Sequence, residues 1–135
     1  ASVLLGIDIN LEDDHKLYLE AADWIGAPYR GGGDSKRGTD CSGMVYQISR
    51  KVYRIQVPRN TEELKNKSNK VAKRNTKEGD LVFFSSNRSR KRVAHVGIYL
   101  KSGKFIHSRT SRGVIVSRLN EDYYLRHWIS GGRIR

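Results

Sequence analysis

The sequence has very few of the residues that cross-link or interrupt a small fold. Cysteine occurs once, at Cys41, which excludes an internal disulfide and any metal site built from several cysteines. Proline occurs twice, and no apolar run approaches the roughly 20 residues that a membrane-spanning helix needs. We therefore expect one domain over residues 1–135 with a core of its own, and residues 1–10 as an N-terminal extension.

Acidic residues are scarce relative to basic ones. The chain has 14 Asp and Glu against 26 Lys and Arg, which gives a formal net charge of +12. Such a balance favours attraction to polyanions, whether nucleic acid, anionic lipid or an anionic cell-wall polymer, and does not choose among them. The start, ASVLLGIDIN, has neither the basic flank nor the cleavage site of a signal peptide.

Hydrophobic periodicity changes midway along the chain. Helical spacing marks a first helix within residues 10–26, a second from Cys41 to about Val52, and a third at RNTEELKNK, where Asn60 and Glu63 form a capping-box pattern. Short β-branched and aromatic runs follow at residues 80–84, 94–100, 104–108, 113–119 and 127–134. Helices followed by strands with hairpin-length turns predict an α+β domain with a mostly antiparallel sheet of about five strands.

The single cysteine stands between a glycine-rich loop, residues 29–40, and the predicted second helix. A thiol at a helix N-terminus meets the positive end of the helix dipole and unpaired N–H groups, both of which favour the nucleophilic thiolate. The alternative is a structural role, since Cys41 also begins the apolar stripe of this helix and lone cysteines are commonly small buried hydrophobes. Helix position alone favours the structural interpretation.

Two of the four histidines could serve Cys41 chemically. His95 and His107 begin and end two strands joined by the turn KSGK, and pairing across this turn brings the imidazoles close together. A cysteine nucleophile needs a base oriented by a third group, so one histidine would be the base and the other its orienter, in either order. His15 is expected in solvent and His127 in a structural role, and no third ligand indicates a metal site.

The glycine run is not a nucleotide-binding loop. From Gly33 to Asp40 the outer spacing matches a P-loop, but Thr39 occupies the position of the required lysine and no buried strand precedes it.

Several blocks of the sequence together resemble one family. The blocks TDCSGMV, GDLVFF, HVGIYL and FIHS occur in this order, with GAPYRGGG before the cysteine and PRNTEEL after it. They resemble the NlpC-type papain-like cysteine peptidases of bacterial cell walls, over about residues 15–134. Asp-Cys-Ser-Gly alone is a weak match, and the ordered set is a specific one.

The resemblance implies a papain-like fold in which the cysteine-bearing helix packs on the sheet. It also implies hydrolysis of amide bonds in the stem peptides of peptidoglycan, commonly the bond between D-glutamate and a diamino acid. Cys41 would be the nucleophile, His95 the base and His107 the third polar member, with no metal or cofactor.

The same resemblance implies roles for the neighbours of the thiol. Tyr29 is expected to stabilise the oxyanion or contact substrate, and Asp40 and Ser42 are expected to bind substrate. Arg59 matches a family position without an assigned role, while Asn60 replaces the usual threonine. The loop SSNRSRKRVA before His95 is unusually basic, and we expect it either to steer anionic substrate or to be a solvated loop.

The expected partners are stem peptides and anionic wall polymers, with no specific nucleic acid and no transmembrane segment. We expect a monomer that acts outside the cytoplasm. The alternatives are a CHAP-type amidase, a papain-like acyltransferase, a catalytically silent wall-binding relative, or a basic nucleic-acid-binding domain. The last of these rests on net charge alone, because the sequence has no basic recognition helix, aromatic-interleaved strand or zinc signature.

Overall fold

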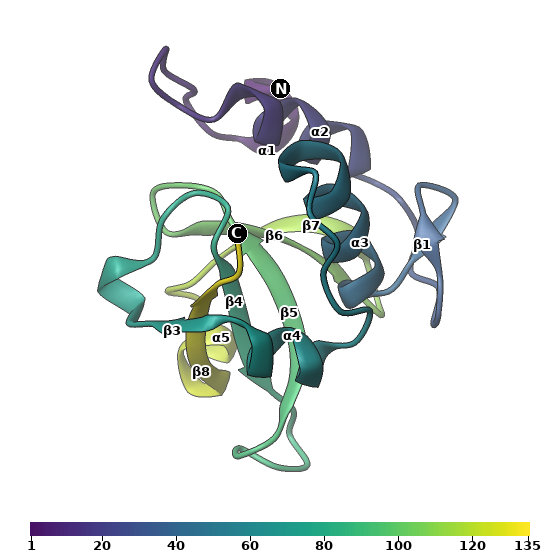
Figure 1. Ribbon diagram of the computed structural model, residues 1–135, viewed down its shortest axis with the longest axis vertical. Coiled ribbons are helices and arrows are strands. Elements are labelled where there is room, and N and C mark those ends of the chain that lie inside the picture. Colours follow the sequence, from purple (N-terminus) through teal and green to yellow (C-terminus); the bar gives the residue numbers. More distant parts are fainter.

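The computed structural model describes all of residues 1–135, with most helices before the sheet along the chain (Figure 1). The helices are α1 (Ser2–Leu5), α2 (His15–Trp24), α3 (Cys41–Ile48), α4 (Thr61–Lys67) and α5 (Asp122–His127), with a π-helical turn η1 (Ser49–Tyr53) continuing α3 and a 3₁₀ turn η2 (Lys73–Asn75). The strands are β1 (Asp34–Ser35), β2 (Gly38–Thr39), β3 (Asn69–Val71), β4 (Leu81–Ser85), β5 (Val93–Tyr99), β6 (Lys104–Arg109), β7 (Gly113–Arg118) and β8 (Trp128–Arg133).

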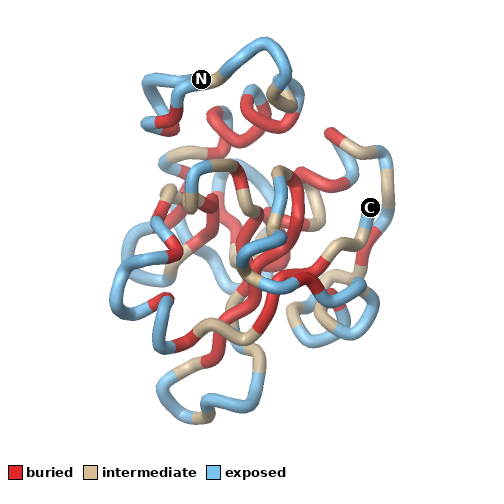
Figure 2. The backbone as a smooth tube through the Cα atoms, turned by 90° about the vertical axis from the view of Figure 1, so that its left-hand side faces the viewer, coloured by how far each residue is buried: buried red, intermediate tan, exposed pale blue.

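A six-stranded antiparallel sheet forms the centre of the molecule, in the order β3-β8-β4-β5-β6-β7. Alternate residues of β4 point to opposite faces. Leu81 and Phe83 join the larger core cluster with residues of α2 and α3, while Val82 and Phe84 join a smaller cluster with Tyr124 of α5. Both faces are therefore covered, which explains why β4 is buried along its whole length (Figure 2).

Three of the helices, α2, α3 and α4, begin where a short polar side chain caps them. Asp14 caps α2 by accepting a hydrogen bond from the Leu17 N–H, and Asn60 caps α4 by accepting one from the Glu63 N–H. The Asn60 cap confirms the predicted start of the third helix, although the Glu63 carboxylate does not return the bond. The helix expected within residues 10–26 is α2, which begins at His15 because Asp14 is its capping residue.

The predicted α+β class and mostly antiparallel sheet are confirmed, with corrections in detail. The strands expected at 80–84, 94–100, 104–108 and 113–119 lie within one residue of β4 to β7. The strand expected over 127–134 is β8, again within one residue at each end, and the short helix α5 before it was not expected. The sheet has six strands instead of about five because β3, a short strand, pairs with β8. Residues 29–40, expected as a loop, contain the small hairpin of β1 and β2.

The first ten residues pack onto the rest of the molecule. Leu5 and Ile7, from the segment expected as an extension, are buried in the larger core cluster. No helix combines the length and the apolar character needed to cross a bilayer.

Candidate active site

The thiol of Cys41 lies at the first residue of α3, between two helices and the sheet. Asp40 is the N-cap, and its carboxylate accepts a hydrogen bond from the Gly43 N–H at 2.8 Å. Cys41 Sγ lies 3.7 Å from Thr61 Oγ1 at the start of α4. As the first helical residue, Cys41 has a backbone N–H without an acceptor inside the helix.

Burial raises the pKa of the Cys41 thiol above its ordinary value, and the negative charge of Asp40 acts in the same direction. The hydrogen bonds from Val96 and Thr61 lower the pKa without outweighing burial. Cys41 is therefore a neutral thiol at pH 7, although its helix position alone favours a thiolate. Attack by this sulfur requires a base that removes the proton.

The two histidines predicted to lie close together do so. His95 Nε2 is 2.7 Å from His107 Nδ1, and His107 Nε2 is 2.7 Å from Ser117 Oγ on β7. Two sets of tautomers satisfy both bonds. In one, Ser117 donates to His107 and His107 donates to His95; in the other, each imidazole carries its proton on Nε2, so that His95 donates to His107 and His107 donates to Ser117. The second set leaves His95 Nδ1 unprotonated. The nitrogen of His95 that can then accept a proton is the one that His107 does not engage.

Both imidazoles are neutral at pH 7. Burial lowers the pKa of His95 to about 4, and the positive charge of Arg109 adds to this effect. Burial also lowers the pKa of His107 well below its ordinary value, with further contributions from His95 and Arg109. A buried imidazole loses the hydration that stabilises its charged form, which explains the direction of both changes.

Cys41 and His95 line the same cavity, of about 250 Å³, where the central strands β4, β5 and β6 end or begin. Its lining residues come from the loop before α3, from α3, from the ends of β4, β5 and β6, and from α5: Tyr29, Cys41, Ser85, Ser86, Ala94, His95, Ser108, Arg109, Thr110, Tyr123 and Tyr124. Arg109 is the only one of these side chains that is charged at neutral pH. The cavity is thus lined by a thiol, a neutral imidazole and one guanidinium.

The other residues expected at the site fall into two groups. Tyr29 lines the cavity, and burial and the neighbouring Cys41 raise the pKa of its phenol, which keeps the hydroxyl protonated. Asp40 and Ser42 do not line the cavity. The guanidinium of Arg59 donates to Asp40 Oδ1 at 3.1 Å, to Ser42 Oγ at 2.8 Å and to the Gly33 carbonyl at 3.0 Å. These residues tie the glycine-rich loop to the start of α3.

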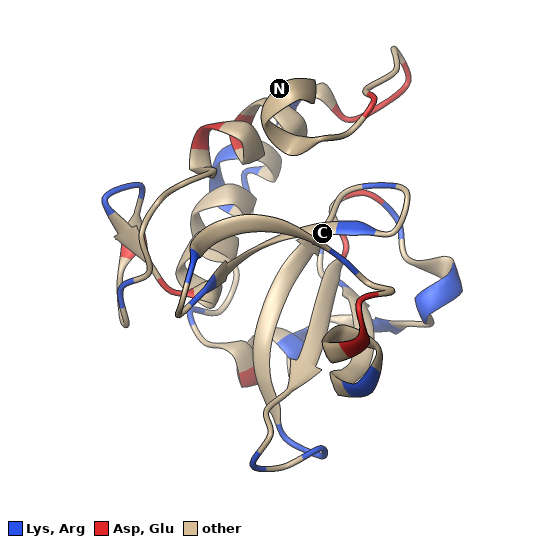
Figure 3. Cartoon of the chain, turned by 180° about the vertical axis from the view of Figure 1, so that it is seen from behind, with Lys and Arg blue, Asp and Glu red and all other residues tan.

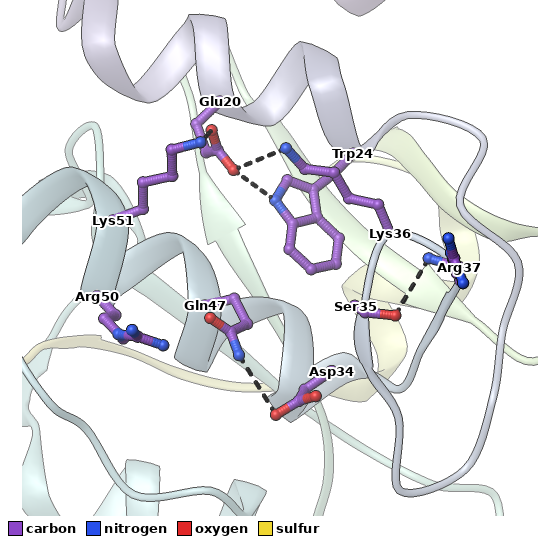
Figure 4. Close-up of a pocket in the computed structure, with 9 residues that line it drawn as sticks. All are labelled: Glu20, Trp24, Asp34, Ser35, Lys36, Arg37, Gln47, Arg50 and Lys51. Atoms are coloured by element: carbon purple, nitrogen blue, oxygen red, sulfur yellow. Dashed lines mark hydrogen bonds and ion pairs between the residues drawn. The ribbon is translucent and has the colours of Figure 1, made fainter.

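A larger cavity, of about 720 Å³, lies away from Cys41 on α2, α3, η1 and the β1–β2 hairpin (Figure 4). At its upper end the Glu20 carboxylate accepts a hydrogen bond from Trp24 Nε1 and forms ion pairs with Lys36 and Lys51 (Figure 4). The buried carboxylate is thus fully paired within the protein and holds α2 against its neighbours. We assign this cavity a structural role, although it is larger than the one at Cys41.

The remaining histidines have the places expected of them. His15 is exposed, and His127 is buried at the end of α5, where its ring contacts the Tyr123 carbonyl and Asn87 Oδ1 at 2.7 and 2.8 Å. No group of three or more His, Cys, Asp or Glu side chains is placed to hold a metal ion.

Sequence reasoning missed Thr61, Arg109 and Ser117. Thr61 directly follows Asn60 in the sequence, and its hydroxyl contacts the thiol. Ser117 reaches His107 only through the pairing of β6 with β7, in which it stands opposite Phe105. No local motif marks these residues, and only the strand register could have indicated Ser117.

Comparison with known proteins agrees with this arrangement. The family model for NlpC/P60 matches residues 26–133, which include Cys41, His95 and His107. This chain belongs to the NlpC/P60 family. A crystal structure of an NlpC/P60 protein from Bacillus cereus superposes with a TM-score of 0.82 at 30% identity, covering 94% of this chain and 42% of that one.

Two curated relatives of this NlpC/P60 chain carry named activities. Murein DD-endopeptidase MepS/Murein LD-carboxypeptidase of Escherichia coli is 36% identical over 93% of this chain, and gamma-DL-glutamyl hydrolase of Bacillus subtilis is 41% identical over 82% of it. The chain spans 65% of the length of the first relative and 27% of the second.

Proposed function

We propose that this chain is a peptidoglycan hydrolase, a cysteine endopeptidase that cleaves an amide bond in the stem peptides of the cell wall. The observation that carries the proposal is the arrangement of Cys41 and His95 on one cavity, with His95 Nε2 held 2.7 Å from His107 Nδ1. A nucleophile, a base and an orienting group are the parts that acyl transfer by cysteine requires. The names of the two curated relatives support this class of substrate.

In the proposed first step, Cys41 Sγ attacks the amide carbonyl carbon while His95 Nδ1 takes the thiol proton. The C–S bond forms, and the carbonyl oxygen becomes an oxyanion that the Cys41 N–H and the Tyr29 hydroxyl stabilise. The C–N bond then breaks as His95 returns the proton to the leaving amine. His95 next takes a proton from water, whose oxygen attacks the thioester. The C–S bond breaks as His95 returns this proton to the Cys41 sulfur, which releases the acid and regenerates the thiol.

We propose the bond between D-glutamate and the diamino acid as the one cleaved. The name of the Bacillus subtilis relative, gamma-DL-glutamyl hydrolase, supports this bond, whereas the Escherichia coli relative is named a murein DD-endopeptidase and LD-carboxypeptidase. Residues 1–135 would form the single peptidase domain, acting as a monomer outside the cytoplasm, where peptidoglycan is found. The net charge of +12 supports anionic wall polymers as a second partner.

The test is digestion of purified peptidoglycan and of defined stem peptides, with products identified by mass spectrometry. Cys41→Ser should lower the rate at least about 1000-fold without changing the melting temperature. His107→Ala should cause a smaller loss, because His107 acts through His95. Equal release of fragments by wild type and Cys41→Ser would overturn the proposal. New ends at the sugar–peptide amide, or transfer of the acyl group to an amine, would assign an amidase or an acyltransferase instead.

A further inference from the structure

Arg109 is a half-buried cation without a partner in the protein. It is the last residue of β6 and lines the cavity of Cys41 and His95, in which no acidic side chain takes part. Its guanidinium makes no ion pair and no hydrogen bond, unlike Arg59, which is paired with Asp40 at the same end of the molecule. A guanidinium presents five N–H donors that match a carboxylate in a two-pronged geometry.

The position of Arg109 brings this charge close to the proposed base. Residues two apart in a strand point to the same face, so Arg109 shares a face of β6 with His107, whose ring contacts His95. The positive charge lowers the pKa of both imidazoles. A cation at this place opposes the imidazolium that forms when His95 takes the thiol proton, unless an anion arrives with the substrate.

We propose that Arg109 binds a free carboxylate of the substrate beside the scissile amide and selects peptides that carry it over the corresponding carboxamides. This inference rests on the proposed function. Stem peptides offer two such groups, the α-carboxylate of the γ-linked glutamate on the acyl side and the carboxylate of the diamino acid on the amine side. In either case the recognised chemistry is the same, a carboxylate in a cavity that has one unpaired guanidinium.

The bound carboxylate has a second effect, on the chemistry itself. Once Arg109 is neutralised, the imidazolium of His95 forms at a lower cost, so the carboxylate raises kcat as well as lowering KM. The other titratable groups near His95 that burial shifts toward their neutral forms cannot supply this charge: Tyr29, Cys41, His107 and Tyr124.

The experiment measures kcat and KM on three soluble stem peptides: one with both carboxylates free, one with the glutamate carboxylate amidated, and one with the diamino-acid carboxylate amidated. For wild type, amidation of the recognised group should lower kcat/KM roughly 10- to 100-fold, and the other amidation should have little effect. Arg109→Gln should remove this discrimination. Arg109→Lys keeps the charge but lacks the two-pronged geometry of the guanidinium, and it should retain part of the discrimination between free and amidated peptides.

Arg112→Gln is the matched control, because Arg112 is an exposed arginine three residues further on and does not line the cavity. It removes the same charge and should leave the discrimination intact. If wild type cleaves all three peptides equally well, or if Arg109→Gln keeps the discrimination, the inference is wrong while the proposed function stands. If wild type and Cys41→Ser release the same products, the proposed function itself has failed.

Discussion

The hydrogen bonds of His95 determine which of its two nitrogens can take part in proton transfer. Nε2 is occupied by His107, whose own second nitrogen is occupied by Ser117. In the tautomer that carries the proton of His95 on Nε2, this leaves Nδ1 as the proton acceptor for the Cys41 thiol, which burial keeps protonated. Neither group is charged at rest, so the proposed chemistry begins from a neutral thiol and a neutral imidazole and separates charge only when substrate is bound.

This resting state predicts an unusual acid limit of activity. The base form of His95 is required, and its pKa is lowered from about 6.5 to about 4, so His95 remains unprotonated as pH falls through 6 and 5. The acid limb of kcat/KM on a soluble stem peptide should therefore be centred near pH 4, provided that circular dichroism shows the protein folded there. Arg109→Gln should move the acid limb to higher pH, because removing the positive charge of Arg109 raises the pKa of His95. A wild-type limb near pH 6.5 would contradict the assignment of His95 as a buried base.

The sequence was sufficient for the reacting residues and insufficient for those that support them. Cys41, His95 and His107 could be proposed because a helix start and one short turn bring them together. Ser117 lies two strand segments away from His95, and its contact depends on the register of β6 against β7. Arg109 has no motif of its own. What distinguishes it is the lack of an acidic neighbour, which only the folded structure reveals.

At the scale of elements, the glycine-rich loop and α3 approach each other so closely at Gly43 that no side chain would fit at this position. A Cβ added at Gly43 would collide with the Gly33 carbonyl and lie 2.9 Å from both Arg59 Nη2 and Asp40 Oδ1. These are the groups that anchor the loop before Cys41. Gly43 therefore permits the contact that fixes the N-terminus of α3 next to the cavity.

Gly43→Ala should lower the free energy of unfolding by about 1–3 kcal/mol and reduce activity. Alanine gains up to about 1 kcal/mol of helix propensity, but the clash with a backbone carbonyl outweighs this gain because the carbonyl cannot rotate away. Urea denaturation and hydrolysis of a soluble peptide measure the two effects. Gly31→Ala is the control, since an added Cβ there meets nothing within 4 Å. Equal urea-denaturation midpoints for Gly43→Ala and Gly31→Ala would show that the glycine-rich loop shifts to accommodate the added methyl group without cost.

The elements that sequence patterns missed have weak local signals. α5 begins after Glu121 without a side-chain cap, and its aromatic residues resemble those of a strand. Its helical form depends on Tyr124 packing against Phe84 and Phe105. β3 is short and has one buried residue, Val71, so it forms only because β8 is present to pair with it. The long periodic segments needed no such tertiary support to be predicted.

At the scale of the whole molecule, positive charge is spread over many loops (Figure 3). One of these loops connects two strands whose ends line the cavity of the candidate site. The connection from β4 to β5 carries Arg88, Arg90, Lys91 and Arg92. It joins Ser85 and Ser86 to Ala94 and His95, which all line the cavity. Arg90 donates to the Arg126 carbonyl, while Arg88, Lys91 and Arg92 are exposed and make no ion pair. Three unpaired cations thus lie on a loop whose two ends line the cavity.

We expect these three cations to speed the encounter with intact peptidoglycan more than the cleavage of a short peptide. Charge near a site raises association with an extended anionic polymer about 10-fold or more at low salt, and the effect fades as the Debye length shrinks to about 3 Å at 1 M. The triple variant Arg88→Gln, Lys91→Gln, Arg92→Gln should therefore digest intact peptidoglycan several-fold more slowly than wild type at low ionic strength. This difference in rate should vanish at high salt, and on a soluble stem peptide it should stay below about twofold.

The control variant removes the same charge from the exposed residues Lys16, Lys70 and Lys77, which do not line the cavity. Equal slowing by the control would assign the effect to net charge, and no slowing by either variant would leave the loop as a solvated connection without a role in steering.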